Sequence, residues 1–137
     1  MSKTIKWEYS PAPEGTGHIE LKKQYELFID GKFVPPKSGK YFKTINPSNE
    51  KTISKVAEAD QSDVNHAVAS AKKAYDKTWS KMLPKERGKY IFRIARLLQE
   101  RAREFSVIET MDGGKPIRES RDVDIPLASA HFFYHAG

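Results

Sequence analysis

Glu109-Thr110-Met111-Asp112-Gly113-Gly114-Lys115-Pro116 joins two predicted helices near the C-terminal end of this 137-residue chain. Paired glycines allow the left-handed conformation in which many helices end. The proline that follows suits the first turn of a new helix. We therefore interpret this stretch as a junction between two elements and not as a catalytic centre.

Helical periodicity continues on both sides of the junction. Upstream, Pro84 suits the first turn of a helix whose apolar residues form one stripe as far as Met111. The stripe consists of Ile91, Ile94, Leu98, Ala102, Phe105 and Ile108. Downstream, a last helical segment is expected over residues 116–136. Pro126 lies inside it and lacks a backbone donor, which predicts a kink or two consecutive helices.

An earlier helix is predicted to begin after Asp60 and to end near Trp79. The carboxylate of Asp60 can accept hydrogen bonds from the first free backbone N–H groups of the helix. Asp63 follows three residues later, which is the spacing of a reciprocal cap.

Two β hairpins are predicted ahead of the helices. Asp30-Gly31 stands between two β-prone runs, residues 25–29 and 32–34, and favours a type I′ turn, which needs positive φ at both positions. The second hairpin joins residues 41–45 to residues 51–56 through a turn at residues 46–50, Asn-Pro-Ser-Asn-Glu.

Strands followed by helices predict an α+β organisation, with hairpins over residues 25–57 and three helices over residues 60–136. The hairpins are expected to stay separate or to form a small antiparallel sheet. Residues 1–24 contain Pro11, Pro13, Gly15 and Gly17 and show little periodicity, so they are interpreted as an extended leader.

The composition of the chain is typical of a single soluble domain, with 38% hydrophobic and 31% charged residues. No apolar run approaches the length of a membrane span or of a signal peptide, and we expect a cytoplasmic protein. The sequence contains no cysteine, which excludes disulfides, thiolate metal sites and a cysteine nucleophile within this chain.

The net charge of +6 raises the question of nucleic-acid binding. Many of the cations lie between Lys81 and Arg103, on the polar side of the predicted stripe helix, where a solvated face is the expected reading. No zinc-finger or RNP-type aromatic motif accompanies them. A basic nucleic-acid-binding domain is therefore the weakest of the functional hypotheses.

The C-terminal residues predict that the chain is part of something larger. It stops at Gly137, just after the aromatic run Phe132-Phe133-Tyr134, with no following strand to cover it. Apolar stripes on three helices offer more surface than short hairpins can bury.

Five motifs stand in a fixed order along the chain. They are Leu27-Phe28-Ile29-Asp30-Gly31-Lys32-Phe33, Thr44-Ile45-Asn46-Pro47-Ser48, Val56-Ala57-Glu58-Ala59-Asp60, the junction from Glu109 to Ile117, and Tyr134-His135-Ala136-Gly137. From Leu27 to Gly137 the chain thus resembles the N-terminal part of the NAD(P)-dependent aldehyde dehydrogenase family. Residues 9–14, Tyr-Ser-Pro-Ala-Pro-Glu, are similar to the branch that includes proteins with two dehydrogenase-like halves.

The resemblance implies a larger α/β fold that oxidises an aldehyde to a carboxylic acid with NAD or NADP. In the family, a cysteine attacks the carbonyl and a glutamate activates the deacylating water. These residues and the dinucleotide-binding motif would lie after Gly137, so no catalytic and no cofactor-binding residue is expected in this chain, and the chain alone is predicted to be inactive.

The expected partner is the remainder of a dehydrogenase chain or a full-length subunit, in a homo-oligomer when complete, with no nucleic acid and no membrane. The alternative is a separately expressed, non-catalytic interaction module, or a degenerate paralogue that binds a full-length subunit.

The resemblance also implies two candidate sites. Thr44, Ile45 and Asp112 correspond to positions that bind a monovalent cation, Na or K, in the family, and hard cations favour oxygen ligands. The alternative is that Asp112 accepts backbone hydrogen bonds at the Gly113-Gly114 turn. Val123 and Leu127 would lie on the wall of the substrate entrance tunnel, although ordinary core packing predicts the same apolar residues.

Three other side chains are of types that can act as a nucleophile or as metal ligands, but the sequence does not support these roles. Lys115 is expected to be a solvated turn lysine and not an amine nucleophile. His131 and His135 have the i, i+4 spacing of two metal ligands, but no third ligand is evident, and partly buried polar residues are the expected reading.

Overall fold

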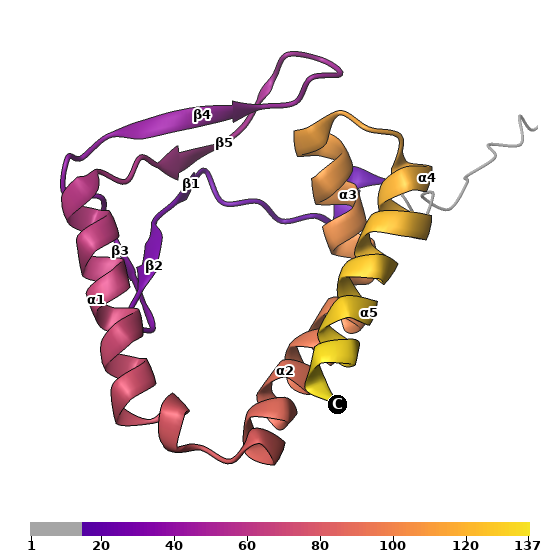
Figure 1. Ribbon diagram of the computed structural model, residues 1–137. Helices are drawn as coiled ribbons and strands as arrows, with labels where there is room; N and C mark the ends of the chain where they lie inside the picture. The colour runs from indigo at the N-terminus through magenta and orange to yellow at the C-terminus, as the bar shows by residue number, and fades with distance from the viewer. Residues whose placement is uncertain (1–14) are drawn as a thin grey trace, which may run out of the picture.

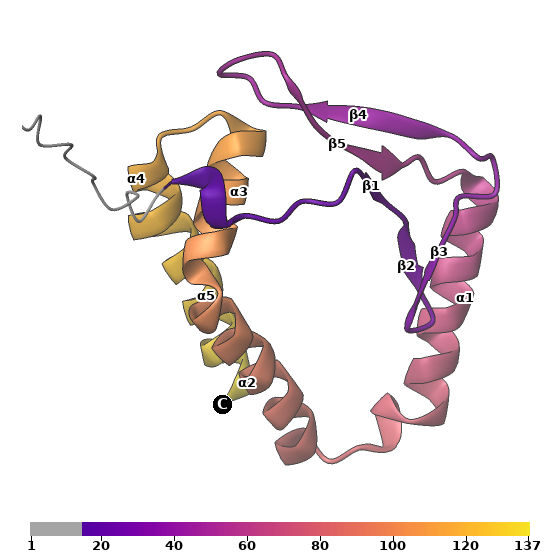
Figure 2. The same ribbon diagram turned by 180° about the vertical axis from the view of Figure 1, so that it is seen from behind.

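The computed structural model describes residues 15–137, which form an open frame with two arms (Figures 1 and 2). The first arm consists of β2 (Leu27–Ile29), β3 (Lys32–Val34) and α1 (Gln61–Lys77), and the second of α2 (Pro84–Glu100), α3 (Ala102–Gly113), α4 (Ile117–Glu119) and α5 (Ile125–Ala136). One end of the frame is spanned by β1 (Gln24–Tyr25), β4 (Tyr41–Ile45) and β5 (Thr52–Ala57). A short 3-10 helix, Trp79–Lys81, connects the arms at the other end.

The predicted β2–β3 hairpin is confirmed. Its two-residue loop has φ 53° at Asp30 and 75° at Gly31, which is the type I′ conformation. The strands are antiparallel, with Ile29 opposite Lys32. The loop is held against α1, because the Ser70 hydroxyl donates to the Asp30 carboxylate at 3.2 Å.

The second hairpin is confirmed as well, but its sheet is not purely antiparallel. β5 lies between β4, which is antiparallel to it, and β1, which is parallel to it. The Ser54 hydroxyl strengthens this edge by donating to the carbonyl of Lys22 at 2.8 Å. Gln24 thus belongs to a strand, although the sequence placed it in the leader. A strand of two residues carries no alternation from which it could be recognised.

Part of the predicted leader falls among the described residues. Residues 1–14 lie outside them. Thr16–His18 form a 3-10 helix, and the chain then runs to β1.

The reciprocal cap at the start of α1 is confirmed. The Asp60 carboxylate accepts from the backbone N–H of Ser62 at 2.8 Å and of Asp63 at 3.0 Å. The Asp63 carboxylate in turn accepts from the N–H of Asp60 at 3.1 Å. Asp63 is buried and also accepts from the N–H of Lys37 at 3.2 Å, so it fixes the loop after β3 to the helix.

The stripe helix begins at Pro84 as predicted but does not run unbroken to Met111. The chain bends at Arg101, with φ −106° and ψ 17°, where α2 ends and α3 starts. The helical hydrogen bond from the Arg101 N–H to the Leu97 carbonyl, at 3.1 Å, persists across the bend. The apolar spacing therefore continues through it, which is why periodicity alone predicted one helix. The Arg101 guanidinium pairs with Glu104 at 2.7 Å, in the first turn of α3.

Small residues let α2 and α5 approach closely. A Cβ at Gly88 would lie 2.5 Å from the carbonyl oxygen of Ala136. Ala95 is fully buried, and its carbonyl accepts from the Ser129 hydroxyl at 3.2 Å. This helix pair is the core of the second arm.

Pro126 interrupts the last helical segment as predicted. The segment consists of α4, a π-helical turn at Ser120–Asp124, and α5, in which Pro126 occupies the first turn. The wider π turn is closed by the N–H of Ile125, which donates to the carbonyl of Ser120. Pro126 follows Ile125 directly. The N–H group that proline lacks would therefore lie at the transition from the π turn to α5, where the backbone hydrogen-bond pattern changes.

The predicted excess of apolar surface is confirmed. Buried apolar side chains among the described residues are few and small or medium in size, namely Ile29, Ala57, Ala95 and Val107. Exposed large ones include Phe28, Phe33, Phe42, Tyr90, Ile94, Leu97, Val123, Leu127 and Tyr134. None of the helices within residues 15–137 combines the length and the hydropathy needed to cross a bilayer.

Replacing Asp63 by alanine is expected to lower the free energy of unfolding by roughly 1–3 kcal/mol, because the N–H groups of Asp60 and Lys37 lose their acceptor. Asp76→Ala, on the exposed side of the same helix, is the matched control. Urea denaturation monitored by circular dichroism measures both. Equal midpoints for the two variants would contradict the role given to Asp63.

Candidate functional site

The candidate site lies where the tip of the β4–β5 hairpin meets the C-terminal end of α3. The Thr44 hydroxyl donates to the carboxylate of Asp112, which is 68 residues further along the chain. Ile45, the next residue of β4, is half exposed. The structure therefore brings together the three residues proposed to bind a monovalent cation.

A second contact holds the hairpin tip against the helix end. Gly114 adopts φ 71° and its N–H donates to the Thr110 carbonyl at 3.0 Å, which confirms the predicted left-handed exit. A Cβ at Gly114 would lie 3.0 Å from two ring atoms of Pro47. Gly113 is still helical, so only the second glycine is required by the backbone conformation.

The prediction that Lys115 is a solvated turn lysine is wrong. Its ammonium group lies 2.7 Å from the Glu109 carboxylate and 2.8 Å from the Asp124 carboxylate. Hydrogen bonds to Asp124 and then to Glu109 raise the pKa of Lys115 above its ordinary value. The amine therefore stays protonated and serves as a bridge between α3 and the π turn, not as a nucleophile.

Further polar contacts around the π turn had no signal in the sequence. Ser120 is fully buried, and its hydroxyl accepts from that of Thr110 at 3.0 Å. Asp122 forms a surface pair with Arg121 at 2.7 Å, which lowers the pKa of the Asp122 carboxyl.

The oxygen atoms at the junction are ligand types that suit a hard monovalent cation. Thr44, Ile45 and Asp112 carry hydroxyl, carbonyl and carboxylate oxygens, which are the ligand types that hard cations prefer, and β4 is the edge strand of its sheet. The C-terminal end of a helix carries partial negative charge, which also favours a cation. Asp112 has Thr44 as its partner and not the Gly113-Gly114 backbone. Within residues 15–137, no three His, Cys, Asp or Glu side chains converge on a common point.

The same helix end is unsuitable for dinucleotide phosphates. Phosphates bind at helix N-termini, where free N–H groups and positive partial charge meet them. Gly113 and Gly114 lie instead at the C-terminus of α3. These glycines therefore do not fit a phosphate-binding loop.

The two proposed tunnel residues lie one helical turn apart on the π turn and on α5. Val123 is 51% exposed and Leu127 is 53% exposed. Neither side chain is buried among the described residues. They form an apolar surface on the second arm.

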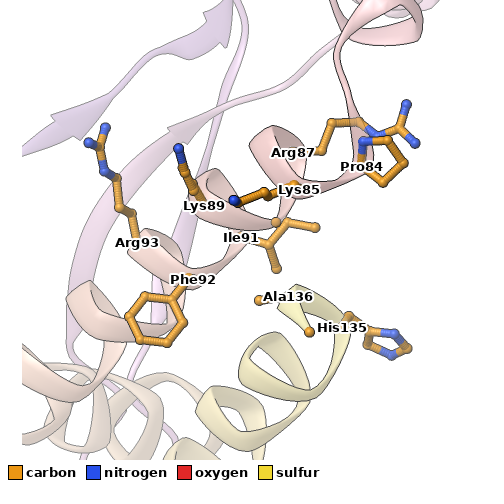
Figure 3. A pocket seen from close by; sticks show the side chains of 11 residues that line it. Pro84, Lys85, Arg87, Lys89, Ile91, Phe92, Arg93, His135 and Ala136 are labelled. Atoms are coloured by element: carbon orange, nitrogen blue, oxygen red, sulfur yellow. The ribbon is translucent and has the colours of Figure 1, made fainter.

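A groove of about 850 Å³ lies between the start of α2 and the end of α5 (Figure 3). Ile91 and Ala136 lie toward each other across it, whereas Lys89 and Arg93 point away from α5.

The family model described as "Aldehyde dehydrogenase family" matches residues 33–137. The chain is similar to a putative aldehyde dehydrogenase, DhaS, of Bacillus subtilis, with 44% identity over 113 residues, covering 82% of this chain and 23% of that protein. It is also similar to a mitochondrial benzaldehyde dehydrogenase of Antirrhinum majus, with 42% identity over 83% of this chain and 22% of that protein.

Solved structures share the backbone course of the frame. An indole-3-acetaldehyde dehydrogenase of P. syringae, in complex with NAD+, has a TM-score of 0.81 and 37% identity, over 85% of this chain and 24% of that chain. An NAD+ complex of an aldehyde dehydrogenase from Bacillus cereus has a TM-score of 0.81 and 34% identity, over 87% of this chain and 26% of that chain. The chain thus spans about a quarter of the length of the proteins that it matches.

Gly114→Ala is expected to lower the free energy of unfolding by about 1–2 kcal/mol, because an L side chain is strained at positive φ and would press on Pro47. The neighbouring Gly113→Ala is the matched control. Its Cβ would meet nothing nearer than 3.5 Å, and alanine is favoured in helices by about 0.5–1 kcal/mol. Urea unfolding of both variants tests the assignment, which fails if Gly114→Ala is as stable as Gly113→Ala.

Proposed function

Because the chain belongs to the aldehyde dehydrogenase family, we propose that it serves as the N-terminal scaffold segment of an enzyme that oxidises an aldehyde to a carboxylic acid with NAD or NADP. The observation that carries this proposal is the family match over residues 33–137, in a chain that spans about a quarter of its relatives and contains no cysteine. The chain alone lacks the nucleophile and is expected to be inactive.

The scaffold role is supported by the contacts at the junction. Thr44 with Asp112, and Pro47 with Gly114, hold the hairpin tip to α3. Lys115 then joins α3 to the π turn through Glu109 and Asp124. These contacts fix the position of the surface that carries Val123 and Leu127. We propose this surface as one wall of the substrate entrance.

A monovalent cation, Na or K, would strengthen the same junction by binding the oxygens of Thr44, Ile45 and Asp112. The domain division that fits this role is a leader at residues 1–24, hairpins at 25–57 and helices at 60–136. Binding of NAD or NADP falls to the remainder of the enzyme, since Gly113 and Gly114 stand at the wrong end of a helix for phosphate. The complete enzyme is proposed to be a homo-oligomer.

The alternative function is a non-catalytic module that binds a full-length subunit. The exposed apolar surface suits this role as well. The two proposals predict different behaviour. A scaffold segment can take the place of the matching segment of a relative. A module instead binds a full-length relative that still contains its own matching segment.

A chimera tests the scaffold proposal directly. When this chain replaces the matching 113-residue segment of the Bacillus subtilis relative, the chimera is expected to reduce NAD in the presence of an aldehyde such as benzaldehyde, because the frame supports the remainder of the fold. The isolated chain is expected to give no NAD reduction. A folded but inactive chimera, or NAD reduction by the pure chain, would contradict the proposal.

Sodium or potassium is expected to stabilise the chain through the junction, by about 1.4 kcal/mol at a concentration ten times the dissociation constant. Thermal unfolding is compared in NaCl, KCl and tetramethylammonium chloride at equal ionic strength. Asp112→Asn and Thr44→Val should abolish or reduce the cation-specific increase in Tm, while Asp76→Asn should retain it. Identical melting in all three salts would rule out the site.

A further inference from the structure

Positive charge is concentrated at one end of the frame. Residues 72–93 contain eight lysines and arginines but two acids, whereas the other residues of the chain contain sixteen of each sign. This stretch therefore accounts for the whole net charge of +6. It runs from the last turns of α1 through the connector into α2, at the end of the frame that lies away from the sheet (Figures 1 and 2). We refer to its cations as the basic end, which consists of Lys72, Lys73, Lys77, Lys81, Lys85, Arg87, Lys89 and Arg93.

Most of these cations have no carboxylate partner. All except Arg87 are exposed. Arg87 donates to the carbonyl of Trp79 at 3.4 Å, and Lys89 pairs with Glu86 at 2.8 Å. Among residues 15–137, the other six form no ion pair. Several cations further along the chain are instead held by neighbouring carboxylates. The basic end therefore keeps most of its charge available for an external anion.

An exposed leucine lies among these cations. Leu83 is the last residue before α2, between Lys81 and Lys85 in the sequence, and it is 69% exposed. Trp79 and Met82, in the same connection, are half-buried. Peripheral proteins bind an anionic bilayer with this combination of groups, because cations meet the headgroups while an apolar side chain enters the layer beneath them.

The form of the basic end favours an extended anionic surface over a small anion. Its cations are spread over two helices and a connector, and Lys89 and Arg93 point away from α5 (Figure 3). Six of the eight are lysines, which act as point charges, whereas base recognition in nucleic acids relies strongly on the planar group of arginine. An exposed leucine also gains more from the apolar layer under lipid headgroups than from a phosphate backbone.

We propose that the basic end is a docking surface for an anionic lipid bilayer, on which the protein lies peripherally. The lysines contact the anionic headgroups, and Leu83 enters the bilayer at their level. The sequence alone predicted a solvated face for these cations and no membrane partner. The structure adds that they gather at one end of the frame around an exposed leucine. This inference does not depend on the proposed function, which concerns the junction and the surface of α5.

Sedimentation with lipid vesicles tests the inference on the purified chain and on the chimera with the Bacillus subtilis relative. Phosphatidylcholine vesicles that contain phosphatidylserine should bind at least tenfold more tightly than phosphatidylcholine alone, because each lysine near an anionic surface strengthens binding by about fivefold. Raising NaCl from roughly 0.1 M to roughly 1 M should abolish the difference, since the Debye length falls from about 10 Å to about 3 Å. Equal binding to both kinds of vesicle, or binding to neither, would overturn the inference.

Charge reversal locates the contact. Lys81→Glu with Lys85→Glu should weaken binding to the anionic vesicles at least tenfold, and Leu83→Ser at least threefold. Lys43→Glu with Lys51→Glu makes the same change of net charge on exposed residues of the β4–β5 hairpin, at the other end of the frame, and is the matched control. It should change binding less than twofold. Far-UV circular dichroism of each free variant checks its fold, and equal effects of the two charge reversals would contradict the assignment.

A second measurement does not depend on the folding of the glutamate variants. The chain has no cysteine, so Leu83→Cys or Lys51→Cys introduces its single thiol for a polarity-sensitive dye. Anionic vesicles should shift the emission to shorter wavelength for the dye at Leu83→Cys and leave the dye at Lys51→Cys unchanged. Equal shifts at both positions, or none at Leu83→Cys, would reject the docking surface.

The outcomes separate this inference from the proposed function. An active chimera that does not bind anionic vesicles would retain the scaffold role and reject the docking surface, even if the isolated chain binds. An inactive chimera that binds them through the basic end would do the reverse. An RNA oligomer bound at least tenfold more tightly than the vesicles would assign the basic end to nucleic acid and overturn the inference.

Discussion

The contact between the β4–β5 hairpin tip and the end of α3 is the constraint on which the frame depends. Gly114 must have positive φ to end the helix and must lack a side chain to accept Pro47. The hydrogen bond from Thr44 to Asp112 fixes the same approach. The connector at Trp79–Lys81 joins the arms at one end of the frame. This contact closes the opposite end, where the chain between Thr16–His18 and β1 also crosses from α3 to the sheet.

Ion pairs connect the end of α3 to the segments that follow it. Lys115 follows the junction directly and is held by one carboxylate before it, Glu109, and one after it, Asp124. The buried hydroxyl pair of Thr110 and Ser120 makes a second link between the same segments. The π turn and α5 are thereby oriented relative to α3 and, through the junction, relative to the sheet.

The sequence predicted the turns and helix caps of the fold but not its long-range contacts. The Asp30-Gly31 turn and the reciprocal cap of Asp60 and Asp63 were recognisable because every partner stands within three residues. The parallel pairing of β1 with β5 was not, since two residues carry no pattern. The bend at Arg101 was hidden because apolar spacing passes through it. At the candidate site, Thr44 and Asp112 were named by resemblance, and their contact is a finding of the structure.

The sequence by itself determined the hairpin turns, the cap of α1 and the absence of any thiol from this chain. Turns and caps depend on φ preferences and on hydrogen bonds between near neighbours, which the order of residues specifies directly. Only the tertiary structure decided that Lys115 is a bridge between α3 and the π turn and that the tip of the β4–β5 hairpin meets the end of α3. Those facts depend on packing between residues tens of positions apart, where distance in space is set by the whole fold and not by local preference.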